Sequence, residues 1–245
     1  MTRFLGGPYR VALCDIGETV VRHNPGFTAT IAREATALGA EAELNNVRRV
    51  IDEEWHHAIA DPTNYGFTAD VDQSKSFWLS LYSTIGARLG LGDSNEFVDR
   101  LYSHFTQFDS YAAMDGAHEA LSQLRHAGIR VVAASNWEPW LLDLLVHLRM
   151  YDLFDHCVVS GIVGLEKPDP RFFLHALDVS GATPIETVHM GDSFEADVQG
   201  AWTVSLDAIW VNTRGDMHRH ECPTATTISE AVDMAINAGC RARDH

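Results

Sequence analysis

The order of hydrophobic periodicities along the chain is the feature that most limits its fold. One short apolar run, residues 9–16, is typical of a strand, and residues 27–110 then show only helical spacing, with apolar residues three and four apart. After a further helical segment over 112–129, short apolar runs alternate with helical segments, as in a parallel sheet covered on both faces. The simplest fold with this order is one α/β core, residues 1–20 and 112–245, interrupted by a helical domain over 21–111.

Composition limits the partners of such a chain. Its 245 residues, 46% hydrophobic and 21% charged, are ordinary globular values and allow a full core. The formal net charge of −16 would repel a nucleic-acid backbone, so we expect no nucleic-acid partner. The first ten residues lack the apolar segment of a secretory signal, and no run reaches the roughly 20 apolar residues of a membrane span. We therefore expect a cytoplasmic protein without membrane contact.

Polar side chains stand where the expected strands end. Ligands of open parallel sheets bind at the carboxyl ends of the strands, so these side chains should meet there. Beyond the first strand come Asp15 and Thr19. The later strands and loops deliver Ser135, Asn136, Lys167, Asp192 and Asp197.

These residue types suit the handling of a phosphoryl group beside a divalent cation. Asp15 and Asp192 are hard oxygen ligands of the kind that Mg²⁺ takes. A hydroxyl such as that of Ser135 donates to phosphoryl oxygens, and Lys167, one of two lysines in the chain, offsets negative charge. Each residue alone also has a simpler explanation as a helix cap or a turn. Their order on successive strand ends is what predicts phosphoryl chemistry.

Four segments resemble, in order and spacing, the four motifs of the haloacid dehalogenase superfamily. They are CDIGETV (14–20), VVAASN (131–136), EKPDPRFF (166–173) and HMGDSFEADVQGA (189–201). PTNYG and SFWLSLY in the helical stretch are similar to the C1 cap of the hydrolase-like subfamily IA. The resemblance implies a Rossmann-like parallel-sheet core with an inserted C1 cap.

The same resemblance implies a covalent mechanism. Asp15 matches the nucleophile that forms an aspartyl-phosphate, and Lys167 the charge that steadies nucleophile and phosphate. Asp15, Asp192 and the main-chain carbonyl of Gly17 match the Mg²⁺ ligands, with Asp197 in support. Ser135, Asn136 and Thr19 are the expected substrate-binding residues. The implied enzyme is a Mg²⁺-dependent phosphohydrolase acting on a small phosphorylated metabolite.

Position 17 departs from the family's phosphatases, which carry a second Asp there as general acid and base. Gly17 has no side chain for this role, whose loss costs about 10²–10⁴-fold in rate. Glu18, His23 or an acid within residues 52–57 are the nearby substitutes. Glu18 should point away from the turn, and residues 52–57 also fit a solvated helix face with Trp55 packed inward.

Three alternatives follow from this departure. Haloacid dehalogenases lack the second Asp but also lack the metal and the acidic pair, whereas this chain keeps Asp192 and Asp197. Phosphonate-cleaving relatives need a cap lysine, and Lys75 is the one lysine in the helical stretch. The third alternative is a binding or scaffold protein that has lost catalysis. Side chains of the helical stretch would select the substrate, with Trp55, His57, Asn64, Tyr65 and Trp78 as candidates by composition.

Overall fold

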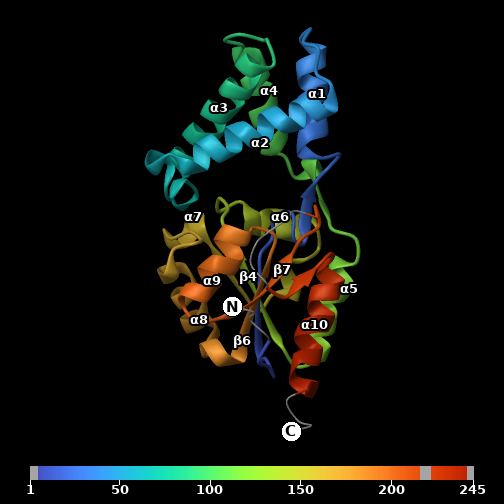
Figure 1. Ribbon diagram of the computed structural model, residues 1–245, viewed down its shortest axis with the longest axis vertical. Helices are drawn as coiled ribbons and strands as arrows, with labels where there is room; N and C mark the ends of the chain where they lie inside the picture. Colours follow the sequence, from blue (N-terminus) through green and yellow to red (C-terminus); the bar gives the residue numbers. More distant parts are fainter. Residues whose placement is uncertain (1–4, 216–221, 242–245) are drawn as a thin grey trace. The chain divides into compact units, whose positions relative to one another are not determined.

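A computed structural model describes residues 5–215 and 222–241 of the chain. The chain divides into two compact units (Figure 1). Residues 1–22 and 113–245 form the first, here called the α/β unit, and residues 23–112 form the second, the helical unit. Each unit has its own buried hydrophobic cluster.

The described residues of the α/β unit contain one six-stranded sheet whose strands all run parallel. Its order is β5-β4-β1-β6-β7-β8. The chain moves outward from β1 to β4 and β5 and then returns to place β6 on the other side of β1, so the order reverses between β1 and β6. The strands are β1 (Val11–Cys14), β4 (Arg130–Ser135), β5 (His156–Val159), β6 (Thr187–Gly191), β7 (Asp207–Val211) and β8 (Thr224–Ala225).

Helices cover both faces of this sheet (Figure 1). Helices α5 (Ala117–His126) and α10 (Ile228–Arg241) pack together on one face, and α8 (Pro170–Ser180) and α9 (Gly200–Thr203) on the other. Both β1 and β6 are buried along their whole length; β1 is accordingly a continuous apolar run, whereas β6 also carries Thr187 and His189. Shorter helices α6 (Leu141–His147) and α7 (Ser160–Val163) follow β4 and β5. The parallel α/β core expected from the sequence is confirmed.

The helical unit is built from four helices that enclose aromatic and aliphatic side chains. They are α1 (Phe27–Ala37), α2 (Leu44–Ala60), α3 (Val71–Arg88) and α4 (Asn95–Phe105). Side chains of Glu43, Asp70 and Ser94 accept backbone N–H groups at the starts of α2, α3 and α4, which satisfies donors that the helix leaves open. Its cluster includes fully buried residues of three helices, Ile31, Ile85 and Phe97.

Short elements complete the fold. Two three-residue strands, β2 (Val21–His23) and β3 (Tyr111–Ala113), pair where the chain leaves and re-enters the α/β unit. The sequence pattern does not predict them because three residues are too few to show a period. Single turns are η1 (Pro62–Asn64), η2 (Phe67–Ala69), η3 (Phe108–Ser110), η4 (Tyr151–Leu153), η5 (Pro184–Glu186) and the π-helical turn η6 (Phe194–Gln199).

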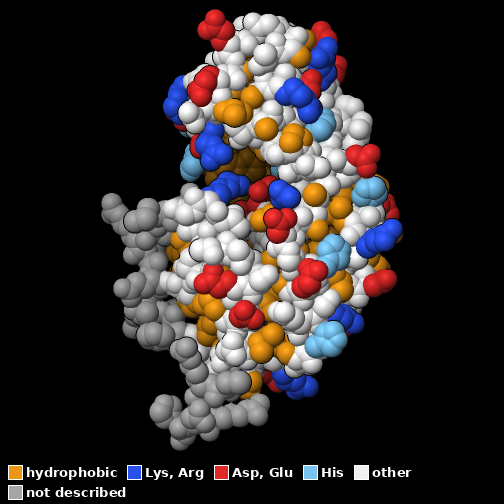
Figure 2. Space-filling view, turned by 90° about the vertical axis from the view of Figure 1, so that its right-hand side faces the viewer, with side chains coloured by type: hydrophobic (Ala, Val, Ile, Leu, Met, Phe, Trp, Pro, Cys, Tyr) orange, Lys and Arg blue, Asp and Glu red, His pale blue; other side chains and the backbone are white. Residues whose placement is uncertain are grey.

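Charged side chains of both signs are interspersed over the face shown in Figure 2. None of the helices within residues 5–215 and 222–241 combines the length and the apolar character needed to cross a bilayer.

Candidate active site

The strand register brings the predicted site residues to one edge of the sheet. Cys14 of β1 is paired with Ala133 of β4 and with Met190 of β6. Asp15, Ser135 and Asp192 each follow within two residues of these partners, so all three stand at the carboxyl edge. Asp15 and Asp192 flank the point where the strand order reverses, which is where open α/β sheets bind ligands.

Asp15 is buried and held on both carboxylate oxygens. Its Oδ1 accepts from Lys167 Nζ at 2.6 Å and its Oδ2 from Thr19 Oγ1 at 3.0 Å. Burial raises the pKa of Asp15, and the nearby Lys167 ammonium opposes that rise. Thr19, expected to bind substrate, therefore also orients the Asp15 side chain.

Lys167 is a buried cation that joins two carboxylates. Its Nζ lies 2.6 Å from Asp15 Oδ1 and 2.6 Å from Asp197 Oδ1. Burial alone would lower the pKa of Lys167, but Asp15 and Asp197 outweigh it and raise that pKa above its ordinary value. The ammonium is thus kept charged beside the carboxylate that is expected to react.

The side-chain amide of Asn136 holds the main chain of Lys167. Its Nδ2 donates to the Lys167 carbonyl at 2.8 Å, and its Oδ1 accepts the Lys167 N–H at 2.7 Å. This two-point contact links the loop after β4 to the loop before α8. Asn136 therefore positions Lys167. The sequence pattern did not predict this contact, because Asn136 was expected to bind substrate. Ser135, beside it, is the buried last residue of β4.

Asp197 is positioned by residues that sequence reasoning missed. His189 Nε2 lies 2.9 Å from Asp197 Oδ1, and the N–H of Ser193 donates to Oδ2 at 3.0 Å. Burial raises the pKa of Asp197, but Lys167 and His189 outweigh it and hold the pKa well below its ordinary value. A methyl group at Gly191 would overlap the Asp197 carboxyl group. Gly191 therefore has to be glycine for Asp197 to reach Lys167.

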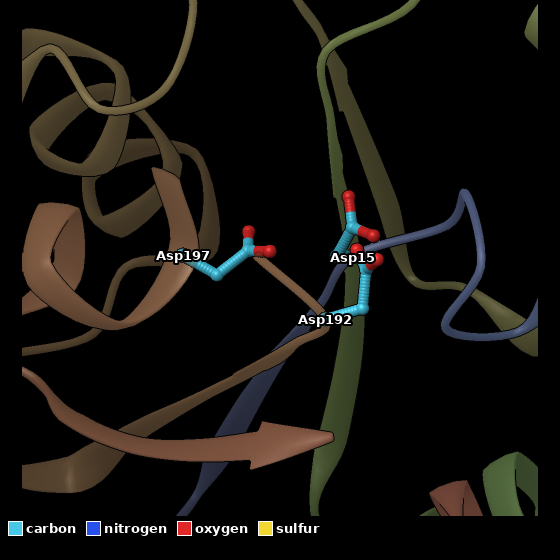
Figure 3. Close-up of side chains that lie close together, drawn as sticks. All are labelled: Asp15, Asp192 and Asp197. Carbon is cyan, nitrogen blue, oxygen red and sulfur yellow. The ribbon is translucent and has the colours of Figure 1, made fainter. Parts of the chain in front are cut away.

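The carboxylates of Asp15, Asp192 and Asp197 converge (Figure 3). One oxygen from each lies within 4.8 Å of the others. Burial and the charges of Asp15 and Asp197 raise the pKa of Asp192 well above its usual range. Three carboxylates facing one lysine leave excess negative charge, and an all-oxygen donor set suits a hard cation such as Mg²⁺. Asp15 and Asp197 share the Lys167 ammonium, and Asp192 stands beside them as the third carboxylate.

Glu18, His23 and residues 52–57, the substitutes considered for the missing acid at position 17, differ in backbone conformation and in the side chains around them. Glu18 adopts a left-handed backbone, with φ of 55°, at the turn after Gly17. His23 packs against the rings of Phe27, Phe105 and Tyr111 within the helical unit. In α2, Asp52 is exposed, while Trp55 stacks on Trp78 with ring centres 5.9 Å apart. Asp52, His56 and His57 are exposed, but Glu54 is buried and paired with Arg88, so residues 52–57 form a solvated face only in part.

Within the helical unit, a groove of about 640 Å³, lined by polar and apolar side chains, opens beside α2 and α3. His57 and Asn64, two of the candidates for substrate selection, line this groove. Trp55 and Trp78 belong to the aromatic packing of the unit, and Tyr65 is exposed. Lys75 is also exposed, with its Nζ 5.5 Å from the centre of the Tyr102 ring.

Comparison with known protein families gives a match over residues 9–201, described as hydrolase, haloacid dehalogenase-like hydrolase. The human haloacid dehalogenase-like hydrolase domain-containing protein 3 is 26% identical over 205 residues, which cover 82% of this chain and 81% of the relative. A glyceraldehyde 3-phosphate phosphatase of Pyrococcus abyssi is 25% identical over 63% of this chain and 71% of its own length. A phosphoserine phosphatase of Thermus thermophilus is 33% identical, over 44% of each chain.

Solved structures share the fold. A HAD-hydrolase of Bacillus subtilis, bound to magnesium, superposes with a TM-score of 0.71 at 16% identity, over 94% of this chain and 99% of that one. An L-2-haloacid dehalogenase of Xanthobacter autotrophicus gives a TM-score of 0.63 at 17% identity, over 93% and 98%. At these identities the likeness concerns the fold and not the reaction.

Proposed function

The chain belongs to the haloacid dehalogenase-like hydrolases, and from this premise we propose that it is a Mg²⁺-dependent phosphohydrolase acting on a small phosphorylated metabolite through an aspartyl-phosphate. The observation that carries the proposal is the buried contact of Lys167 with Asp15 and Asp197, with Asp192 beside them. The similarity to phosphatases of glyceraldehyde 3-phosphate and phosphoserine supports phosphoryl transfer over other hydrolyses.

Each residue has a role in the proposed reaction. Asp15 attacks phosphorus, because it is the carboxylate held by both Lys167 and Thr19. Lys167 keeps positive charge beside the Asp15 carboxylate, and Asp197 holds Lys167 in place. Ser135, at the end of β4, donates its hydroxyl to a phosphoryl oxygen. Asn136 positions Lys167 through the two main-chain contacts described above.

Asp15, Asp192 and the Gly17 carbonyl would hold the metal ion. A bound Mg²⁺ supplies positive charge that offsets the negative charge of the phosphoryl group and the carboxylates. We also propose that the helical unit acts as a cap that selects the substrate, because it has a groove of its own to which His57 and Asn64 contribute polar side chains.

The test is phosphate release with Mg²⁺ from acetyl phosphate and from an ordinary sugar phosphate. Wild-type protein should release phosphate, and Asp15→Asn should abolish release while leaving the protein folded, because an amide fills the same space but is not a nucleophile. Asp143→Asn on the exposed side of α6 is the matched control and should retain activity. Acid-quenched enzyme should carry a phosphoryl group on Asp15.

Three other outcomes identify the alternatives. Halide release from a 2-haloacid without added metal indicates a dehalogenase. Cleavage of a phosphonate that is lost in Lys75→Met indicates the phosphonate-cleaving chemistry. A folded wild-type protein that releases neither phosphate nor halide is a binding or scaffold protein. Full phosphate release by a folded Asp15→Asn variant would rule out the covalent mechanism.

A further inference from the structure

The space beside Gly17 is filled by an aromatic ring. A Cβ atom built at Gly17 would lie 3.2 Å from Cζ3 and 3.8 Å from Cε3 of Trp137. The first distance is tighter than a relaxed carbon–carbon contact of 3.5–4.0 Å, so the ring would have to shift by a few tenths of an ångström to admit a Cβ atom. The benzene edge of the indole thus closes the position two residues after Asp15.

Backbone conformation does not explain why position 17 is glycine. Glycines with a left-handed backbone occur at several turns of the described chain, but Gly17 is not among them. An L-residue would therefore meet no backbone strain at this position. The obstacle to a side chain at position 17 is the Trp137 indole.

Trp137 is held by the chain around it. The main-chain N–H of Trp137 donates to Ser160 Oγ at 2.9 Å. Its main-chain carbonyl accepts from Ser160 Oγ at 3.1 Å and from the Gly161 N–H at 3.0 Å. The indole packs edge-on against Trp140, with ring centres 5.4 Å apart and planes at 79°. The loop after β4 is therefore fixed to the start of α7, and rotating the indole away from Gly17 would lose its edge contact with Trp140.

The groups that hold Asp15 are poor proton donors for a leaving group. The Lys167 ammonium already donates to the carboxylates of both Asp15 and Asp197, and the Thr19 hydroxyl already donates to Asp15. On the side of Gly17, ring carbon atoms of Trp137 line the site. The arrangement favours a leaving group that departs as a stable anion without receiving a proton.

We infer that Trp137 is a specificity-determining residue, which restricts the proposed phosphohydrolase to phosphoryl compounds with weakly basic, planar leaving anions. Carboxylates of acyl phosphates and acidic phenolates of aryl phosphates share this chemistry, and a flat anion can pack on the indole. This inference rests on the proposed function and narrows its substrate class.

The reaction balances without a protein acid. The Asp15 carboxylate forms a bond to phosphorus, the bond from phosphorus to the leaving oxygen breaks, and the carboxylate product keeps that electron pair. Water then attacks phosphorus of the aspartyl-phosphate, and both of its protons end on the released dihydrogen phosphate while Asp15 returns as carboxylate. An alkyl phosphate would instead release a strongly basic alkoxide, whose departure needs a proton in the transition state.

The first experiment measures kcat/KM of the wild type with Mg²⁺ for acetyl phosphate, phenyl phosphates of increasing phenol pKa, and an alkyl phosphate. We expect a steep fall as the leaving group becomes more basic, from a carboxylic acid near pKa 4 to phenol near pKa 10 and beyond. A higher kcat/KM for an acyl phosphate than for an aryl phosphate with a leaving group of equal pKa would identify acyl phosphates as the substrate class, and the reverse order would identify aryl phosphates. A flat dependence would overturn the inference, because it shows that a proton donor acts.

The second experiment opens the space beside Gly17. Gly17→Asp alone should change alkyl phosphate turnover little, whereas Gly17→Asp with Trp137→Ala should raise it by up to about 10²–10⁴-fold. Gly17→Asn with Trp137→Ala is the matched control, with the same volume and no acid. A full gain from Gly17→Asp alone, or equal turnover by the Asp and Asn double variants, would overturn the inference.

A stability readout tests the steric part without activity. Gly17→Ala should lower the melting temperature in the wild type and lower it less in the Trp137→Ala background, because contacting residues couple. Equal losses in both backgrounds would show that the indole does not limit position 17. Absence of phosphate release from every substrate would overturn the proposed function and this inference with it, whereas release with a flat leaving-group dependence would overturn this inference alone.

Discussion

At the scale of single residues, the charged groups of the predicted site can be identified from the sequence, but the contacts that hold them in place cannot. Asp15, Lys167, Asp192 and Asp197 stand out in the sequence because they occur in order at the ends of expected strands and in the loops that follow, and the structure brings all four together. His189 belongs to an apolar strand pattern, where a histidine signals nothing by itself. Its contact with Asp197 depends on the neighbouring turn, which periodicity cannot predict.

Lys167→Met should destabilise the protein. Methionine is similar in size, but the substitution leaves Asp15 and Asp197 buried without their shared cation, a loss worth about 3–5 kcal/mol in unfolding free energy. The matched control is Lys75→Met, which removes the other lysine of the chain from an exposed position and should cost less than about 1 kcal/mol. Chemical denaturation without added metal measures both. Equal stabilities of the two variants would contradict the central role of Lys167.

Asp192→Asn should remove Mg²⁺-dependent stabilisation. A ligand at 100 times its dissociation constant stabilises the folded protein by about 2.7 kcal/mol, and losing one of two carboxylate ligands should abolish most of that gain. Without metal the variant should be at least as stable as the wild type, because Asp15 and Asp197 disfavour a charge at Asp192. Melting temperatures with and without Mg²⁺ measure this, with Asp143→Asn as control. An unchanged Mg²⁺ response would refute the proposed ligand.

At the scale of elements, strand β6 and the turn η6 together hold Asp197 in position. His189 and Gly191 are two residues apart, so they lie on the same face of β6, and both meet Asp197. The sequence predicts a helix over residues 194–202, whereas the structure has the π-helical turn η6 followed by the four-residue α9. The wider turn has no signature in hydrophobic spacing, and such turns occur frequently at functional sites.

Gly191→Ala should displace Asp197 from its position beside Lys167. The added methyl group overlaps the Asp197 carboxyl group, so the turn has to shift, at a cost of about 1–3 kcal/mol typical of overpacking. Turnover should fall as well, because Asp197 can no longer hold Lys167. In an Asp197→Ala background the same substitution should cost less stability, since the obstructed group is gone. Equal costs in both backgrounds, measured by denaturation, would show that Gly191 does not serve Asp197.

At the scale of the whole molecule, a single break in periodicity predicts that the α/β fold is interrupted. Helical spacing over residues 27–110 and alternation afterwards are long patterns, and long patterns are the most dependable part of a sequence. The compact units, residues 1–22 with 113–245 and residues 23–112, change over at the paired strands β2 and β3. Strands of three residues carry too few side chains to reveal such a junction in advance.

Removing the helical unit tests whether site and selection are separable. Because Asn24 N donates to Ser110 O at 2.8 Å, the two chain crossings lie side by side, and a short Gly-Ser linker can join Arg22 to Ala113. All the residues assigned to the reaction remain, together with the buried cluster of the α/β unit. We therefore expect a folded protein that keeps its Mg²⁺-dependent rise in melting temperature and loses discrimination among substrates of different size. Retained discrimination would place selection in the α/β unit, and a folded variant that loses its Mg²⁺ response would place a metal ligand in the helical unit.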